Sequence, residues 1–199
     1  MYMANIIRRS LFQTSAPTPP LVLVNHLIGT ATQYIDTGLT GTKYNIEIKC
    51  KATSMPSNGV LPWGTTNGYL FLYATNGVGW NTTGSQITVS GIDTMNFRIY
   101  NQHYYNTSLA QLYIDGADKG VRGTQQTTGA LYLFKASGYM DRQSRLSVEY
   151  CKIWTYGPEG SQTLLRDFVP ALYNGRPGLY DRQNDVMYYS MSGDDFSYD

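Results

Sequence analysis

The acidic residues that could catalyse a reaction are scattered in this sequence. A retaining glycosidase needs two carboxyl groups about 5–5.5 Å apart across one cleft. Glu47 and Glu149 each stand alone in an apparent strand, and Asp194 and Asp195 are adjacent, so the latter two would point to opposite faces. No Ser/His/Asp or Cys/His spacing supports a nucleophile either. The sequence therefore predicts a protein that is not an enzyme.

The cysteines and histidines do not form a zinc motif. Cys50 and Cys151 are far apart in the chain, and so are His26 and His103. Each cysteine lies in an apparent strand, at a position that shares a face with neighbouring isoleucines, so both are predicted to point inward. Two interpretations remain open: buried free thiols, which we favour, and a disulfide between neighbouring strands.

Acidic loops offer a weak case for calcium, which prefers carboxylate and carbonyl oxygens. The best candidates are Asp115 and Asp118, which flank Gly116, and the pair Asp181 and Asp185. Aspartate in such turns more often caps its own backbone. We therefore expect no cofactor, with calcium as the alternative.

Aromatic and amide side chains are the strongest candidates for ligand binding. The chain has 18 tyrosines and three tryptophans, and several loops combine them with Asn, Gln, Thr and His. Sugars stack on aromatic rings and present hydroxyl groups to amides, so these loops predict a glycan site. Its candidate residues are Trp80, His103, Tyr104, Tyr105 and Asn106. The competing interpretation is a Tyr-rich protein interface, whereas Trp63 and Trp154 are assigned to packing.

The elements that would position these residues are β-strands throughout. Residues 44–52 alternate strictly between apolar and polar, as a half-buried strand does. The apolar run that begins at Leu21 predicts a strand covered on both faces. Dipeptides such as Asp115-Gly116 and Asn174-Gly175 supply the residues of tight hairpins. About a dozen short strands without a long helical period predict an antiparallel sandwich, formed by one domain over residues 21–199.

Residues 1–20 are predicted to be an N-terminal arm that anchors the domain to other proteins. Its Pro-rich part, QTSAPTPP at 13–20, favours extended backbone. The candidate docking residues are Ile6, Ile7, Arg8, Arg9, Leu11 and Phe12. The arginines follow the apolar residues, unlike the order in a secretory signal. A net charge of +1 without a basic stripe argues against nucleic acid as partner, and no apolar run approaches the about 18 residues of a membrane span.

Several motifs, taken in order, resemble one family. They are YIDTG at 34–38, Trp63-Gly64, LYIDG at 112–116, LYLF at 131–134 and DFVPALYNGRPGLYD at 167–181. Over residues 30–196 the chain resembles the laminin-G-like branch of the concanavalin A-like lectin/glucanase superfamily. The resemblance implies an all-β fold, a two-sheet antiparallel jelly-roll sandwich with a short extended N-terminal arm. In the last motif, Pro170 is expected to end one strand and Gly178 to turn the chain into the next.

The resemblance also implies a class of function, because single domains of this kind are common in phage virion proteins. We expect a non-enzymatic bacteriophage virion protein, assembled in the host cytoplasm, that serves as a capsid decoration, head-fibre or tail-fibre component. Its lectin-like jelly roll would bind host-surface glycans. It would join other virion proteins through the arm and form a homo-oligomer, with no nucleic-acid or membrane partner. The alternatives are a purely structural subunit without ligand and a bacterial cell-surface glycan-binding protein.

Overall fold

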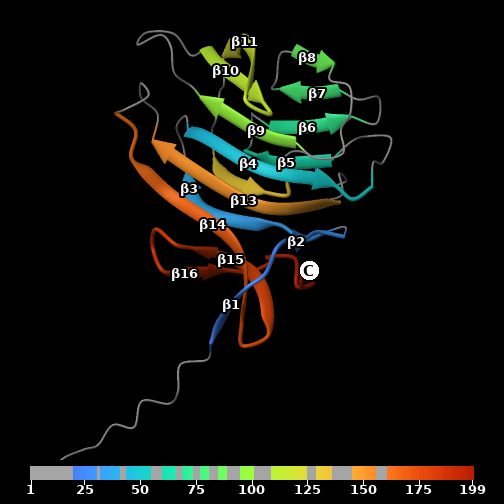
Figure 1. Cartoon of the computed structure of the whole chain (residues 1–199), viewed down its shortest axis with the longest axis vertical. Coiled ribbons are helices and arrows are strands. Elements are labelled where there is room, and N and C mark those ends of the chain that lie inside the picture. Colours follow the sequence, from blue (N-terminus) through green and yellow to red (C-terminus); the bar gives the residue numbers. More distant parts are fainter. Residues whose placement is uncertain are drawn as a thin grey trace, which may run out of the picture.

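Two antiparallel β-sheets make up the protein (Figure 1). The computed structural model describes residues 20–30, 32–40, 44–54, 60–65, 69–73, 77–80, 85–88, 95–100, 109–124, 129–135, 145–155 and 161–199. Within these ranges every regular element is a strand and none is a helix. The prediction of an all-β antiparallel fold is therefore confirmed. The predicted arm, residues 1–20, lies outside the described residues except for Pro20.

The larger sheet has eleven strands, of which eight follow one path in the order β11-β10-β9-β4-β13-β14-β15-β16. Their bounds are β4 Tyr44–Ala52, β9 Met95–Tyr100, β10 Leu109–Ile114, β11 Ala117–Thr124, β13 Leu146–Thr155, β14 Leu164–Tyr173, β15 Arg176–Asp181 and β16 Val186–Tyr188. Three short strands join it from the side: β1 Leu21–Leu23, β2 Leu27–Ile28 and β17 Ser197–Tyr198. β1 pairs with β14, while β2 pairs with both β13 and β17.

The smaller sheet has six strands in the order β3-β12-β5-β6-β7-β8. Their bounds are β3 Ile35–Thr40, β5 Val60–Gly64, β6 Tyr69–Tyr73, β7 Gly77–Trp80, β8 Ser85–Thr88 and β12 Ala130–Leu133. One hydrophobic cluster draws residues from both sheets, among them Ile46 and Ile48 of β4 and Leu131 and Leu133 of β12. Trp63 is 1% exposed, so its predicted packing role is confirmed. The core thus lies between the two sheets, as the period-2 pattern of residues 44–52 requires.

A β-bulge in β13 changes which side chains face outward. Val148 pairs with Cys50 and Tyr150 pairs with Lys49, so Glu149 is an extra residue on the β13 side. The bulge shifts the alternation by one residue. Val148 before it and Cys151 after it are therefore both buried, while Glu149 and Tyr150 both stand on the outer face.

The predicted roles of Pro170 and Gly178 are wrong. Both lie inside strands, β14 and β15, and the turn between these strands is Asn174-Gly175, with φ of 56° and 75°. The Pro170 carbonyl accepts a hydrogen bond from the Val24 N–H at 3.1 Å, so the backbone oxygen and nitrogen of Pro170 point toward the β1 side. The missing N–H of Pro170 therefore breaks no hydrogen bond between β14 and β15. Gly178 serves close packing, because a Cβ there would collide with the Tyr188 carbonyl oxygen.

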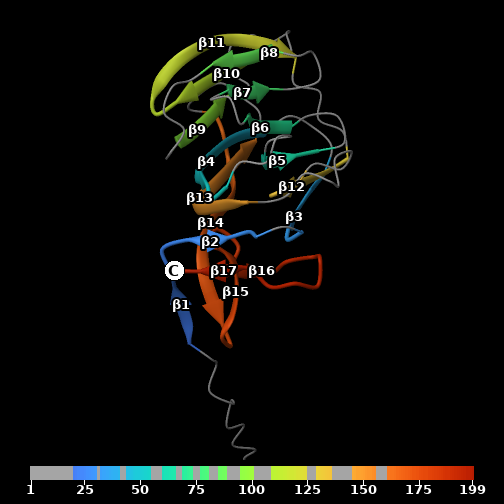
Figure 2. The same cartoon turned by 90° about the vertical axis from the view of Figure 1, so that its right-hand side faces the viewer.

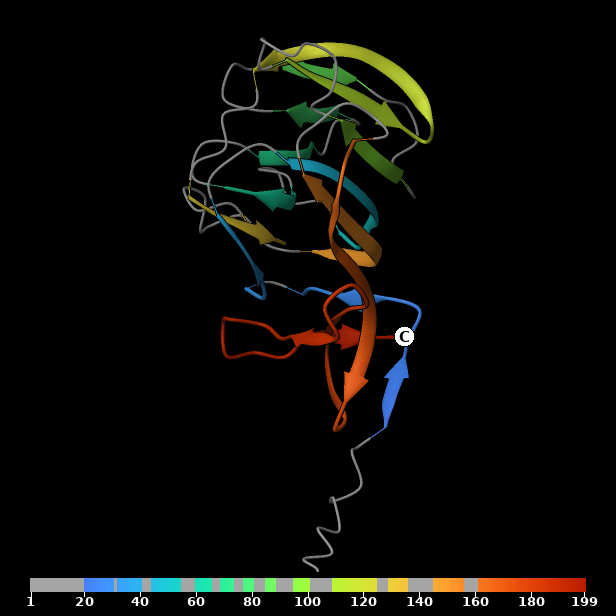
Figure 3. The same ribbon diagram turned by 90° about the vertical axis from the view of Figure 1, so that its left-hand side faces the viewer.

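The expectation of a strand covered on both faces at residue 21 is also wrong. Leu21, Val22 and Leu23 are 37%, 48% and 59% exposed. Figures 2 and 3 show why: β1 runs beside the β14–β15 hairpin, which extends away from the body of the two sheets. The apolar run is therefore a surface feature, next to residue 20 where the predicted arm ends.

Candidate ligand pocket

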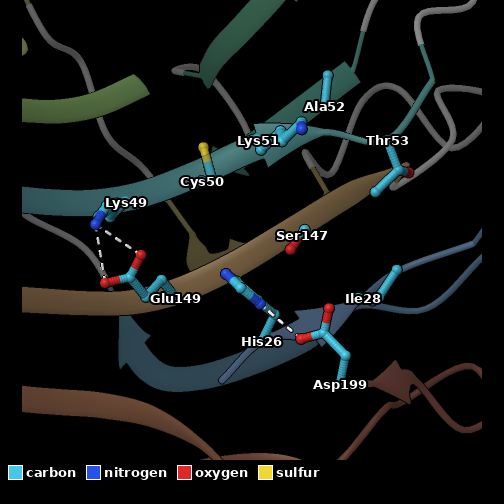
Figure 4. Close-up of a pocket in the computed structure, with 10 residues that line it drawn as sticks. All are labelled: His26, Ile28, Lys49, Cys50, Lys51, Ala52, Thr53, Ser147, Glu149 and Asp199. Atoms are coloured by element: carbon cyan, nitrogen blue, oxygen red, sulfur yellow. Dashed lines mark hydrogen bonds and ion pairs between the residues drawn. The ribbon is translucent and has the colours of Figure 1, made fainter. Parts of the chain in front are cut away.

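A pocket of about 540 Å³ opens on the outer face of the larger sheet, away from the core. Ligand pockets typically measure about 300–1,000 Å³. Strands β4, β13 and β2 form its walls, together with Asp199, which follows β17. The lining residues are His26, Ile28, Lys49, Cys50, Lys51, Ala52, Thr53, Ser147, Glu149 and Asp199 (Figure 4). Segments from four distant parts of the chain therefore meet at one site.

One side of the pocket is held by an ion pair across β4 and β13. The Lys49 ammonium donates to Glu149 Oε1 at 2.9 Å and lies 2.7 Å from Oε2. This contact depends on the bulge, which places Glu149 on the same face as Lys49. The two side chains are 34% and 41% exposed, so the ion pair contributes little to stability. Its main effect is to position the Glu149 carboxylate.

The other side is held by His26 and Asp199. His26 Nδ1 lies 2.6 Å from Asp199 Oδ1. The backbone reinforces this contact, since the N–H groups of Asn25 and His26 donate to the Asp199 carbonyl at 2.8 and 3.3 Å. β17 pairs with β2, which in turn pairs with β13. Asp199 therefore forms a wall of the pocket (Figure 4).

Polar groups at the remaining side of the pocket are not engaged by the described part of the protein. Lys51 and Ser147 are direct partners across β4 and β13. Thr53 continues the same face two residues further on, and its N–H donates to the Arg145 carbonyl at 2.9 Å. Within the described ranges, the Lys51 ammonium and the Ser147 and Thr53 hydroxyls make no hydrogen bond or ion pair. These three groups are available to a ligand.

The pocket gathers a serine, a histidine and an aspartate, a grouping that the sequence reasoning missed. Catalysis by such a set requires the serine hydroxyl to hydrogen bond to the histidine. His26 contacts Asp199, but no hydrogen bond joins Ser147 to His26 in the described structure. No sequence signal could have predicted the grouping, because residues 26, 147 and 199 meet only through strand pairing.

The two strand carboxylates that the sequence singled out lie on one outer face, but each has its own partner. The Tyr150 hydroxyl donates to Glu47 Oε1 at 2.7 Å, while Lys49 binds Glu149. Glu47 pairs with Lys152 across the strands and Glu149 lies at the bulge. Each carboxylate is therefore held by a donor of its own and is not directed with the other at a shared substrate position.

The calcium candidates occupy two tight turns. Asp115 and Gly116 have φ of 51° and 77° and close the β10–β11 hairpin, as the sequence predicts. Asp118 pairs with Tyr113 in the same hairpin. Among the described residues no group of three or more His, Cys, Asp or Glu side chains is arranged to hold a metal ion.

Asp181 and Asp185 organise the turn between β15 and β16. Asp181 is fully buried, and its Oδ1 accepts from the N–H groups of Asp167 and Gln183 at 2.9 and 3.1 Å. Its Oδ2 accepts from Asn184 Nδ2 at 2.6 Å and lies 3.6 Å from Arg166 Nε. Donors within the protein thus surround the Asp181 carboxylate, as expected for a turn-capping aspartate.

Asp185, at the other end of this turn, has a φ of 57° and accepts a hydrogen bond from the Tyr180 hydroxyl at 2.7 Å. That hydrogen bond is the main cause of a raised pKa for Tyr180, because it favours the protonated phenol.

Cys50 and Cys151 are both buried and both free, so the interpretation as buried thiols is confirmed. Burial raises the pKa of Cys50 to about 12 and raises that of Cys151 well above its ordinary value. The thiolate is the reactive form of cysteine. Burial therefore disfavours the reactive thiolate form of both cysteines in the folded protein.

The predicted glycan residues and arm residues fall outside what the structure describes. Residues 103–106 and 1–19 are not among the described ranges. Trp80 ends β7, where its backbone pairs with Leu70 and Ser85, and its side chain is not described. The predicted aromatic site is thus a separate hypothesis from the pocket.

Comparisons with known proteins add no family assignment: no protein-family model matches this chain, and no curated protein matches it. None of the described elements is a helix of the length and apolar character needed to cross a membrane. The site must therefore be interpreted from its own geometry.

Proposed function

We propose that this chain is a non-enzymatic surface protein of a bacteriophage virion, a capsid decoration, head-fibre or tail component. In this proposal its two sheets form a concanavalin A-like jelly roll that binds host-surface glycans. The observation that carries the proposal is the open polar pocket on the outer sheet face, with free hydroxyl and ammonium groups beside carboxylates already held by internal donors. Such a site can hydrogen bond to sugar hydroxyls without supplying a free acid and base pair.

The test is binding of the purified protein to an immobilised panel of bacterial polysaccharides. Ser147→Phe places an aromatic ring in the pocket and should abolish binding. Lys152→Phe is the matched control, because it adds the same ring to the same strand and the same outer face, beside Glu47 and outside the pocket lining. If Trp80→Ala or Tyr104→Ala abolishes binding while Ser147→Phe does not, the glycan site is the predicted aromatic rim. If no polysaccharide binds, the lectin function is wrong.

One observation favours a second candidate function, a structural subunit that acts only through assembly. The side chains of β1 form an exposed apolar strip, Leu21, Val22 and Leu23, directly after the predicted anchoring arm. Exposed apolar edge strands in soluble proteins tend to be covered by a partner. Deletion of residues 1–20 should leave the domain folded but unable to join its assembly. Normal assembly of the truncated protein would contradict the anchoring role.

A further inference from the structure

We propose that the protein dimerises through strand β1, which pairs with β1 of a second copy in an antiparallel arrangement centred on Val22. The observation that carries this proposal is an exposed strand edge: β1 pairs with β14 on one side and with no described strand on the other. The interface does not involve the pocket, so failure of the dimer and failure of the proposed glycan binding are separate results.

The free edge of β1 presents the backbone groups of two residues, Leu21 and Leu23. The Val24 N–H donates to the Pro170 carbonyl of β14 at 3.1 Å. Backbone groups of alternate residues point to the same side of a strand, so those of Val22 also face β14. Those of Leu21 and Leu23 therefore point away from β14, and they make no hydrogen bond to another described residue. A second strand can bind to them.

The free edge is limited at both ends, and these limits fix the register of pairing. Two residues before Leu21 the sequence has Pro19, whose nitrogen carries no hydrogen. Two residues after Leu23, the N–H of Asn25 already donates to the carbonyl that follows β17, at 2.8 Å. Pairing over the whole free edge therefore sets Leu21 opposite the second copy's Leu23, and Val22 opposite its own equivalent. In this register each copy donates both leucine N–H groups to carbonyls of the other.

The side chains of β1 are complementary to a second copy of the same strand. All three are apolar and exposed, on both faces of the strand. In the proposed register the leucines of the two copies lie together on one face of the joined sheet, and the two valines meet on the other. No residue from 20 to 25 carries a charge, so the pairing sets no like charges opposite each other. The edge is thus self-complementary, as a two-fold symmetric interface requires.

β1 also lacks the features that keep edge strands apart in soluble proteins. Such edges usually carry a charged side chain, a proline or a bulge. Residues 21–24 include no charged residue and no proline, and the pairing of β1 with β14 has no register shift. The exposed edge is therefore suited to pairing and is not protected against it.

The position of β1 leaves space for the second copy. β1 lies beside the projecting β14–β15 hairpin and is the outermost described strand on that side (Figures 2 and 3). In Figure 3 β1 runs toward the body of the two sheets, so an antiparallel second copy runs away from it. The bodies of the two copies would then lie at opposite ends of the interface, and their larger sheets would join edge to edge.

Sedimentation equilibrium of charge-exchange variants tests this interface. The parent protein should form dimers that dissociate on dilution. Val22→Lys and Val22→Glu should each weaken dimerisation at least about tenfold, because each sets two like charges directly opposite each other. An equimolar mixture of the two variants should restore dimers, because a lysine then faces a glutamate. Met191→Lys and Met191→Glu are the controls and should leave dimerisation unchanged, because Met191 is an apolar residue outside β1 that is 59% exposed.

Disulfide formation provides a second measurement that does not depend on charge. Val22→Cys should form a covalent dimer under mild oxidation, because the Cα atoms of such a pair are about 4.5 Å apart, within disulfide range. The two native cysteines are buried and should not compete. Met191→Cys is the control and should remain uncrosslinked. Thermal unfolding of each variant shows that the fold is retained.

A parent protein that stays monomeric at high concentration would overturn the proposed dimer, and so would dimers that Val22→Lys leaves intact. If each charge variant is monomeric and their mixture is monomeric too, β1 does not face its own equivalent. The strand would then be covered by another protein or by residues 1–19, and the proposed pairing would be wrong.

Discussion

Removal of the Asp181 carboxylate should be among the most damaging single changes to this fold. Asp181 is fully buried and accepts hydrogen bonds from two backbone N–H groups and from Asn184 Nδ2, with Arg166 Nε at 3.6 Å. Asp181→Ala leaves the N–H groups of Asp167 and Gln183 without this acceptor. It also removes the carboxylate beside Arg166, whose side chain is only 16% exposed and whose Nε keeps a hydrogen bond to the Thr37 carbonyl. Each unsatisfied buried donor costs about 1–3 kcal/mol, but the turn can relax, so the costs do not add. We expect a loss of about 3–5 kcal/mol, as for other broken buried pairs.

Asp195→Ala is the matched control. Asp195 also pairs with an arginine, through Arg176 Nε at 2.8 Å, but the two side chains are 50% and 45% exposed. An exposed pair contributes about 0–1 kcal/mol. Urea unfolding followed by tryptophan fluorescence measures both variants against the parent protein. If Asp181→Ala costs no more than Asp195→Ala, the reasoning about the buried carboxylate is wrong.

Three further predictions concern backbone packing, pH and the exposed strand. Gly178→Ala should destabilise the protein by about 1–3 kcal/mol through overpacking against the Tyr188 carbonyl. Gly175→Asn should cost less in the same unfolding assay, because Gly175 has open space around it in a left-handed turn position. Burial raises the pKa of both thiols, so the stability that the protonated thiols provide is complete below the ordinary pKa of 9.0 and is lost as the pH rises toward the folded pKa of about 12 for Cys50. Replacing both cysteines with alanine should therefore flatten the fall of the unfolding free energy between these pH values, by up to about 1.4 kcal/mol per pH unit per thiol. An unchanged slope would contradict the burial argument. Leu23→Lys, at a 59% exposed position, should change the unfolding free energy by no more than about 0.5 kcal/mol, and it should lower self-association in sedimentation if β1 is an assembly surface.

Local patterns predict local structure well in this chain. The alternation over residues 44–52 gives the buried face of β4, and the dipeptides at 115–116 and 174–175 give two hairpin turns, because each pattern reflects a constraint on its own backbone. The bulge in β13 also leaves a trace in the sequence. Buried Val148 and buried Cys151 are three residues apart, which strict alternation does not allow.

Pairing between distant segments cannot be predicted in the same way. Pro170 suggests the end of a strand, but its backbone nitrogen and oxygen face the β1 side, so the strand continues through it. Gly178 suggests a turn, but it is needed because the Tyr188 carbonyl packs against it. The exposure of Leu23 follows from the position of β1 at the side of a projecting hairpin, which composition does not reveal. The pocket is the clearest case, because its residues are brought together only by the registers of β2, β4, β13 and β17.

We propose that the protein binds a glycan without cleaving it, and one measurement tests both parts of this proposal. An end-labelled polysaccharide retained from the binding panel is incubated with the protein, and the bound fraction and the chain length of the released polysaccharide are measured together. We expect the polysaccharide to be retained, with its chain length unchanged after prolonged incubation, and Ser147→Phe to abolish the retention. Shortened chains, lost when Glu47 or Glu149 is changed to glutamine, would contradict it.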